Sequence, residues 1–299
     1  MKKIIALLVF SVITFTGFSQ EEDNDDQAKS NIQTYTPSKL LKKGQWDIKF
    51  FNNLYTQTKA ANSNDDVSKN EPRETYFTST IDVFTGVSEN SKLNIGLLIE
   101  MRSNVVGNRK ALDIFKFDGV RGTARSGITS IAPAIKFNPF KNVSNFTIQT
   151  AFHIPLVDNE SEDFLPINNN NGVFLDQTAF TFQNRFFYDY TFPSGDWQLF
   201  TELNTEYNFG EKTSFADKTF VLAPGVFLSY FPNQEFTILG FAQHQQRVGD
   251  FEQDFTALGF GGKYQLCKTL NLEVLYSNFV RGNTTGLGQS FNIGLRALF

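Results

Sequence analysis

The sequence is poor in the residues that build disulfide scaffolds and metal centres. It has one cysteine, Cys267, and two histidines among its 299 residues. A single cysteine excludes an intramolecular disulfide framework and any cysteine-based zinc site. Two histidines leave little scope for a histidine-rich metal site. We therefore expect neither a metal nor a cofactor.

An excess of charge of one sign is also absent. The chain has 27 Lys and Arg residues against 31 Asp and Glu residues, and charged residues make up 19% of it. No strongly basic surface is therefore available to bind nucleic acid. Aromatic residues reach 15%, and 34 residues are Phe, which is far more than the core of an ordinary soluble domain uses.

Long apolar runs are missing after the first nineteen residues. Two lysines precede an apolar run at 4–10, and Gly17 and Ser19 are small residues at positions −3 and −1 of a cut before Gln20. A membrane-spanning helix needs about 20 apolar residues, and polar Thr and Ser interrupt this run early. We therefore expect a cleaved signal peptide at 1–19.

The next segment, 20–44, begins with the acidic sequence Glu-Glu-Asp-Asn-Asp-Asp at 21–26. Such a segment is too hydrophilic to bury much apolar surface, so we expect a disordered lead-in. The remaining residues, 45–299, form the folded domain. If the exported chain enters a membrane, it must do so as a closed β-barrel, because lipid cannot satisfy the polar groups of an open sheet edge.

Polar and apolar side chains alternate with a period of two from Gln45 onward. In 145–157, for example, Phe146 and Ile148 fall on one face and Gln149 falls on the other. Helical spacing would scatter these residues, so the pattern predicts strands. We expect twelve of them, at 45–58, 74–88, 92–106, 128–139, 145–157, 174–192, 197–210, 217–231, 235–248, 254–267, 270–282 and 288–299.

Short and long connections alternate between these strands. The short ones include 89–91 and 140–144, and the long ones include 59–73, 107–127 and 158–173. This pattern is typical of an antiparallel up-and-down transmembrane β-barrel, with short periplasmic turns, longer extracellular loops and both termini on the periplasmic side. A soluble β-sandwich is the alternative, but its connections have no reason to alternate in length.

The last strand carries a more specific signal. Phe291, Ile293, Leu295 and Phe299 fall on one face, and the chain ends in Phe. This segment resembles the outer-membrane barrels of Gram-negative bacteria, whose last strand ends in an aromatic residue read by the barrel-assembly machinery. The resemblance implies an outer-membrane location, with membrane lipids and that machinery as partners.

A second resemblance covers the opening of the domain. Tyr35-Thr36-Pro37-Ser38, Leu40, Lys43-Gly44-Gln45-Trp46 and Phe50 resemble the start of outer-membrane transporters. Among these is the MetA-pathway of phenol degradation family. The resemblance implies transport and identifies no site residues.

The polar face of each strand would turn toward the lumen, because a Lys or Arg facing lipid at the midplane costs about 2–4 kcal/mol. The resulting lumen candidates are Asp47, Lys49, Asp82, Glu100, Arg102, Lys136, His153, Arg185, Asp189, Glu202, Glu206, Lys263, Glu273, Arg281 and Arg296. Gly259 and Gly261 would also face inward and relieve crowding at a bend. The expected anchors at the membrane interface are Trp46, Tyr188, Tyr190, Trp197 and Tyr230.

The lumen can be interpreted in two ways. A network of ion pairs could fill it, or it could hold a narrow polar path. About eight strands leave a filled interior and about 16–18 leave an aqueous channel, so twelve strands fall between these cases. The leading hypothesis is passive transport of small molecules, including apolar or aromatic ones, without catalytic residues.

Two other functions remain open. One is a barrel that transports nothing and serves as a structural or adhesion module or as an anchor for a partner protein. The other is a lipid-modifying enzyme, which requires a nucleophile and a base within hydrogen-bond reach. That enzyme would need a Ser close to His153 or His244 on the lipid-facing side.

Overall fold

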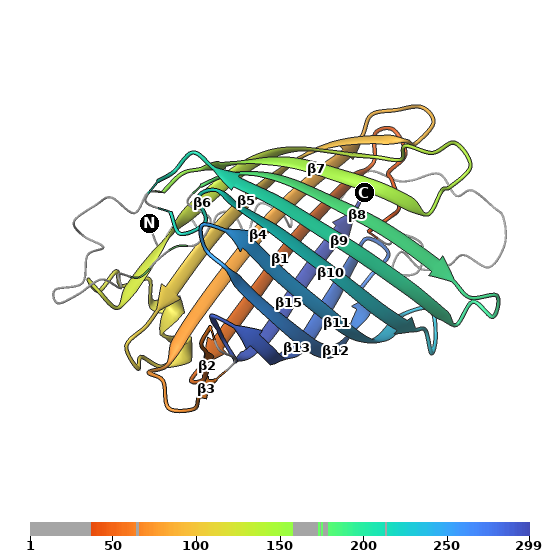
Figure 1. Ribbon diagram of the computed structural model, residues 1–299. Coiled ribbons are helices and arrows are strands. Elements are labelled where there is room, and N and C mark those ends of the chain that lie inside the picture. The colour runs from red at the N-terminus through yellow and green to blue at the C-terminus, as the bar shows by residue number, and fades with distance from the viewer. Residues whose placement is uncertain (1–36, 64–65, 158–172, 174, 176–178, 213) are drawn as a thin grey trace.

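Twelve strands form a closed antiparallel barrel in the computed structural model (Figure 1). The structure describes residues 37–63, 66–157, 173, 175, 179–212 and 214–299. The expected signal peptide and most of the expected lead-in lie outside these residues. Within the described residues, no helix is long and apolar enough to cross a membrane.

The barrel strands agree with the twelve predicted ranges to within four residues, except that the strand predicted at 174–192 begins at Phe180. They are β1 (Trp46–Gln57), β4 (Glu74–Gly86), β5 (Leu93–Val105), β6 (Ala124–Phe137), β7 (Phe146–Pro155), β8 (Phe180–Thr191), β9 (Trp197–Phe209), β10 (Thr219–Tyr230), β11 (Phe236–Gly249), β12 (Gln253–Gln265), β13 (Leu270–Asn283) and β15 (Gln289–Leu298). The predicted all-β, up-and-down barrel is confirmed.

Each barrel strand pairs with its neighbours along the chain, and β15 pairs with β1 to close the barrel. At the closure the amide of Trp46 donates to the carbonyl of Phe299 at 2.9 Å, and the amide of Phe299 donates back to Trp46 at 2.9 Å. Closure leaves the twelve-stranded barrel without an edge strand, which is what a spanning β-structure requires.

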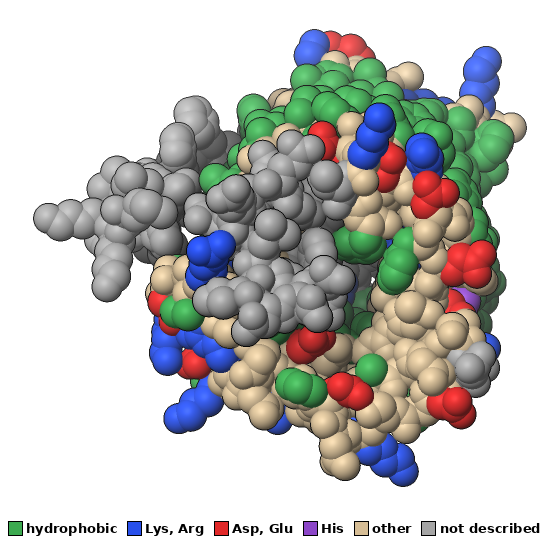
Figure 2. Space-filling view, turned by 60° about the vertical axis from the view of Figure 1, so that its left-hand side comes forward, with side chains coloured by type: hydrophobic (Ala, Val, Ile, Leu, Met, Phe, Trp, Pro, Cys, Tyr) green, Lys and Arg blue, Asp and Glu red, His purple; other side chains and the backbone are tan. Residues whose placement is uncertain are grey.

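The outer face of the wall is apolar. Phe220, Ile238, Phe260 and Ile293 are among its exposed side chains. Figure 2 shows hydrophobic side chains over the wall behind the rim, while other residue types prevail around the rim itself. A soluble sandwich would turn its apolar face inward, so this surface favours the barrel in a membrane.

Short and long connections alternate, as predicted, from β1 to β10. The connections 250–252 and 284–288 are as short as the turns, so the alternation does not extend to the end of the chain. Turns such as 192–196 and 266–269 lie at one end of the barrel, and connections such as 58–73 and 106–123 lie at the other. The connections at this second end contain structure that the sequence pattern did not predict. It comprises a small sheet of β2 (Ala60–Ala61), β3 (Val67–Ser68) and β14 (Thr285–Gly286), and a 3-10 helix, η2 (Ala111–Lys116).

The η2 helix packs on the outside of the barrel. Ile114 is fully buried against Phe77 of β4 and Val105 of β5, and the Ser103 hydroxyl donates to the carbonyl of Ile114 at 2.6 Å. Both Phe77 and Ser103 point to the outer face. The loop between β5 and β6 therefore folds outward against the wall.

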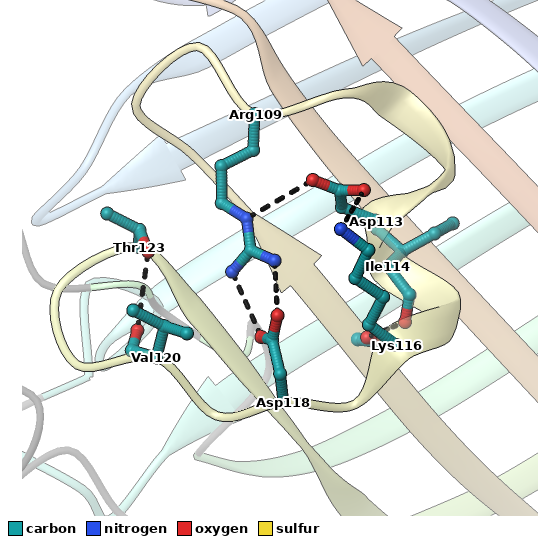
Figure 3. Close-up of polar contacts among 8 residues, drawn as sticks. Arg109, Asp113, Ile114, Lys116, Asp118, Val120 and Thr123 are labelled. Carbon is teal, nitrogen blue, oxygen red and sulfur yellow. Dashed lines mark hydrogen bonds and ion pairs between the residues drawn. The ribbon is translucent and has the colours of Figure 1, made fainter.

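Ion pairs hold this loop together (Figure 3). The guanidinium of Arg109 binds both carboxylate oxygens of Asp118 and lies 3.5 Å from Asp113, which also pairs with Lys116 at 2.8 Å. The hydrogen bond from Arg109 holds the pKa of Asp118 below its usual range. The carboxylate of Asp118 therefore stays charged in mildly acidic solution.

Candidate functional site

The register of the strands shows which side chains face the lumen, because residues opposite each other in a ladder share a face of the sheet. Lys49 pairs with Asp82 on one side and Arg296 on the other, and all three line a cavity inside the barrel. Fourteen of the fifteen predicted lumen residues share this inward face. They are Asp47, Lys49, Asp82, Glu100, Arg102, Lys136, His153, Arg185, Asp189, Glu202, Glu206, Lys263, Glu273 and Arg296.

Arg281 is the exception, and its predicted lumen position is wrong. A β-bulge in β13 adds one residue, Val280, so the pairing changes from Ala257 with Phe279 to Thr256 with Arg281. One extra residue reverses the face of every side chain beyond it. Arg281 therefore shares the outer face with Thr256 and His244.

Most lumen charges are paired. Arg296 binds both carboxylate oxygens of Asp47 at 2.7 Å, and Arg185 binds Glu202 at 2.7 Å. Lys263 lies 2.8 Å from Glu273, and Arg102 lies 2.7 Å from Glu100. Such pairs fix the charged side chains against the wall, because breaking a buried pair leaves one charge uncompensated.

An aromatic ladder, formed by Phe187, Phe200, Phe227 and Phe241, runs around the inner wall across β8 to β11. The ring centroids of successive members are 6.0, 5.4 and 5.3 Å apart. The sequence pattern did not reveal this ladder, because aromatic residues were expected on the lipid-facing side of the wall. The signal was nevertheless present, since each Phe stands at an inward position of its strand.

Gly259 makes room for one end of the aromatic ladder. It faces inward, as predicted, and lies opposite Phe241 in the register. A Cβ atom at this position would lie 2.2 Å from the Phe241 ring and 2.5 Å from the carbonyl of Tyr276. Close packing of a ring, rather than relief of a bend, therefore explains the glycine.

The opposite side of the lumen is filled by the N-terminal segment, residues 37–45. Ser38 and Leu41 are fully buried, and Leu41 packs against Phe84 and Leu98. The amide of Leu41 donates to Oδ1 of Asn94 at 3.2 Å. Residues 37–44 thus differ from the unpacked lead-in expected for them, because the barrel interior supplies the apolar partners that an isolated segment lacks.

Small side chains of the wall leave space for this segment. Ala132 and Ala134 of β6 and Ala151 of β7 belong to the same buried cluster as Leu41. The Thr147 hydroxyl donates to the carbonyl of Ser38. The segment therefore narrows the lumen on the β4–β7 side.

A cavity of about 410 Å³ remains beside the N-terminal segment. The aromatic ladder lines one part of it, and Pro37 borders it from the segment. Five cationic side chains (Lys49, Lys136, Arg185, Lys263 and Arg296) and three carboxylates (Asp82, Glu202 and Glu273) also line it. The cavity is thus aromatic on one side and carries more positive than negative groups.

The two histidines do not form the lipid-facing site that the enzyme hypothesis requires. The Nδ1 atom of His153 lies 3.3 Å from the hydroxyl of Ser130, but both residues are buried on the lumen side. His244 lies on the outer face, where its Nδ1 atom is 3.0 Å from the Thr256 hydroxyl. No serine contacts His244 among the hydrogen bonds of the described residues.

Comparison with known proteins identifies the kind of fold. No protein-family profile and no curated protein matches the sequence. Among solved structures, the chain is similar to the COG4313 outer membrane channel from Pseudomonas putida F1, with a TM-score of 0.67 and 8% sequence identity over 88% of this chain and 98% of that one.

The chain is also similar to the β-domain of the Bordetella autotransporter BrkA, with a TM-score of 0.54 and 12% identity over 85% of this chain and 99% of that one. The chain has the fold of an outer-membrane β-barrel. The predicted resemblance to this class is confirmed at the level of fold, over nearly the whole length of both solved barrels.

The predicted anchor and assembly residues lie on the outside of the barrel. Trp197 and Tyr230 pair across β9 and β10 near a short turn, with ring centroids 4.8 Å apart. Trp46, Tyr188 and Tyr190 are likewise exposed, as are Phe291, Ile293, Leu295 and Phe299 of the last strand. Their roles as membrane anchors and as an assembly signal stay predictions.

Proposed function

We propose that the protein is a passive outer-membrane channel for small molecules. The observation that carries this proposal is the cavity inside the lumen, which the paired charges and the N-terminal segment leave open. The solved COG4313 barrel of the same fold is an outer membrane channel, which supports the same class of function.

The cavity lining also favours solutes with an apolar or aromatic part. Phe200, Phe227 and Phe241 present their rings to the cavity beside charged groups such as Lys263. Ring surfaces bind apolar and aromatic groups through dispersion and offset stacking. The solute would therefore contact the aromatic ladder as it crosses the lumen.

We further propose that residues 1–19 are removed on export and that the barrel-assembly machinery recognises the last strand, which ends in Phe299. The apolar outer wall would then contact membrane lipids directly. The exposed apolar face of β15 supports the proposed contacts with the barrel-assembly machinery and with membrane lipids. Mass spectrometry of the mature N-terminus would test the cleavage.

A second candidate is a barrel that anchors or adheres without transporting. The paired charges, such as Arg296 with Asp47, and the packed Leu41 favour it, since both fill the interior. Transport and anchoring differ in one measurable property, which is the conductance of the lumen.

Single-channel conductance of the refolded mature protein in a planar bilayer tests the proposal. We expect stable conductance steps that change when Arg102 or Arg185 is replaced by Gln, because both face the lumen. Arg281→Gln is the matched control on the outer face, and it should leave the steps unchanged. A folded barrel that never conducts would overturn the channel proposal in favour of the anchor.

A further inference from the structure

Three polar side chains form a row, called the donor row, across three neighbouring strands. Lys136 of β6 pairs in register with Gln149 of β7, and Gln149 pairs with Arg185 of β8. All three side chains line the cavity. Their hydrogen-bond donors therefore approach the same part of the lumen.

Two members of the donor row have unused hydrogen-bonding capacity. Lys136 is 4% exposed, yet it forms no ion pair with the described residues, and its one side-chain hydrogen bond with them, to the carbonyl of Lys39, is 3.5 Å long. Gln149 is also 4% exposed, and its Nε2 group has no hydrogen-bond partner among the residues that the structure describes. Buried donors without acceptors are costly, so an acceptor from a bound solute would relieve them.

The third member, Arg185, also has unused hydrogen-bond donors. Its Nε atom binds Glu202 at 2.7 Å, and no hydrogen bond is formed by its terminal nitrogens within the described part of the chain. A guanidinium offers five N–H donors and binds planar carboxylates well. Arg185 can therefore bind a second carboxylate beside Glu202.

The donor row adjoins the aromatic ladder at Phe187. The ammonium of Lys136 lies 5.3 Å from the centroid of the Phe187 ring, and the guanidinium carbon of Arg185 lies 5.1 Å from it. Phe187 is also the first member of the ladder, stacked on Phe200. Positive charge and aromatic surface thus meet at one residue inside the cavity.

We propose that the donor row binds the carboxylate of a small aromatic acid while its ring lies against the aromatic ladder. This inference rests on the proposed channel function and names its substrate class. The excess of cationic over anionic groups in the lining favours an anion. The cavity volume of about 410 Å³ falls within the range of small-molecule sites.

Titration calorimetry of the full refolded protein with benzoate, and with the neutral benzamide as its near-isostere, tests this site. We expect benzoate to bind about tenfold more tightly than benzamide, because a charged acceptor strengthens each hydrogen bond. Lys136→Met should weaken benzoate binding about tenfold and leave benzamide binding unchanged. Gln149→Leu should weaken benzoate binding less.

Lys141→Met, in an exposed turn between β6 and β7, is the matched control and should not change the affinity. Heat-dependent gel mobility and circular dichroism would show that each variant is folded. Equal binding of benzoate and benzamide, or benzoate binding that survives both Lys136→Met and Gln149→Leu, would overturn the inference.

Conductance in potassium chloride distinguishes the two proposals. A protein that conducts chloride salts but shows no preference for benzoate would refute the carboxylate site and leave the channel intact. A protein that binds benzoate at the donor row but never conducts would refute the channel. In that case the donor row would bind carboxylates but would have no role in transport.

Discussion

The two sides of the lumen are built from the same alternating strands, yet they are filled differently. On the β4–β7 side, the inward residues Ala132, Ala134 and Ala151 are small, and Leu41 of the N-terminal segment fills the space. On the β8–β11 side, the inward residues include Phe200 and Phe227, which fill their own space and border the cavity. Side-chain size on the inner face therefore decides where the lumen stays open.

The largest effect is expected on the β4–β7 side, where the N-terminal segment fills the lumen. Leu41→Ala should lower the free energy of unfolding by about 2–5 kcal/mol, because it empties a fully buried site whose neighbours relax only in part. Urea unfolding in phospholipid vesicles, followed by tryptophan fluorescence, measures the change. Leu266→Ala, in an exposed turn, is the matched control. Equal losses in both variants would mean that the N-terminal segment does not stabilise the barrel.

The aromatic side should be sensitive to added volume. Gly259→Ala places a Cβ against the Phe241 ring and should cost about 1–3 kcal/mol through overpacking. Displacing that ring toward the cavity should also reduce conductance. Gly240→Ala, on the outer face of the adjacent strand, meets nothing closer than 3.9 Å and should be tolerated. If both variants behave alike in the unfolding assay, the close packing of Phe241 is unimportant.

A change in the charge of the cavity lining should have a smaller effect than the two packing changes above. Glu202→Gln removes the carboxylate that pairs with Arg185. Two unit charges 4 Å apart in water interact with about 1 kcal/mol, so the loss of this carboxylate should shift ion selectivity toward anions about fivefold. The reversal potential in a salt gradient measures this ratio. Glu235→Gln, in a short turn, should leave it unchanged. A shift toward cations would contradict the assignment of Arg185 to the pathway.

The smallest effect on stability is expected for a change in the loop outside the lumen. Asp118→Asn breaks the exposed ion pair with Arg109 and should cost about 1 kcal/mol or less. Because the pKa of Asp118 is lowered in the folded loop, its stabilisation is present at neutral pH and is lost as pH falls through that lowered value. Limited proteolysis of the loop at neutral and acidic pH measures both effects. Conductance should not change.

Predictions based on period two succeeded because they depend on a local rule. Adjacent residues of a strand point to opposite faces, so Arg185 and Glu202 could be assigned to the lumen without knowledge of the fold. The same rule failed at Arg281, where a single bulged residue, Val280, reverses the faces. Nothing in the local pattern marks that insertion, since it depends on pairing between strands.

The donor row and the aromatic ladder show a different limit. Each Phe of the ladder could have been placed on the inner face by parity, but which rings contact each other depends on the register between adjoining strands. Lys136 and Arg185 meet at one ring only because β6, β7 and β8 pair in a particular register. Spacing along the sequence does not contain that register.

The sequence by itself determined the strand order, the alternation of connection lengths from β1 to β10 and the polarity of each face outside the bulge in β13, because these follow from nearest neighbours along the chain. Only the tertiary structure decided that residues 37–45 pack inside the barrel and that the β5–β6 loop folds against its outer wall. Leu41 is buried against residues of β4 to β7 and against Leu298 of the last strand, so its burial becomes favourable only after the barrel has closed. Ile114 is buried against the outer face of the hairpin β4–β5, so its burial requires that these two strands have paired.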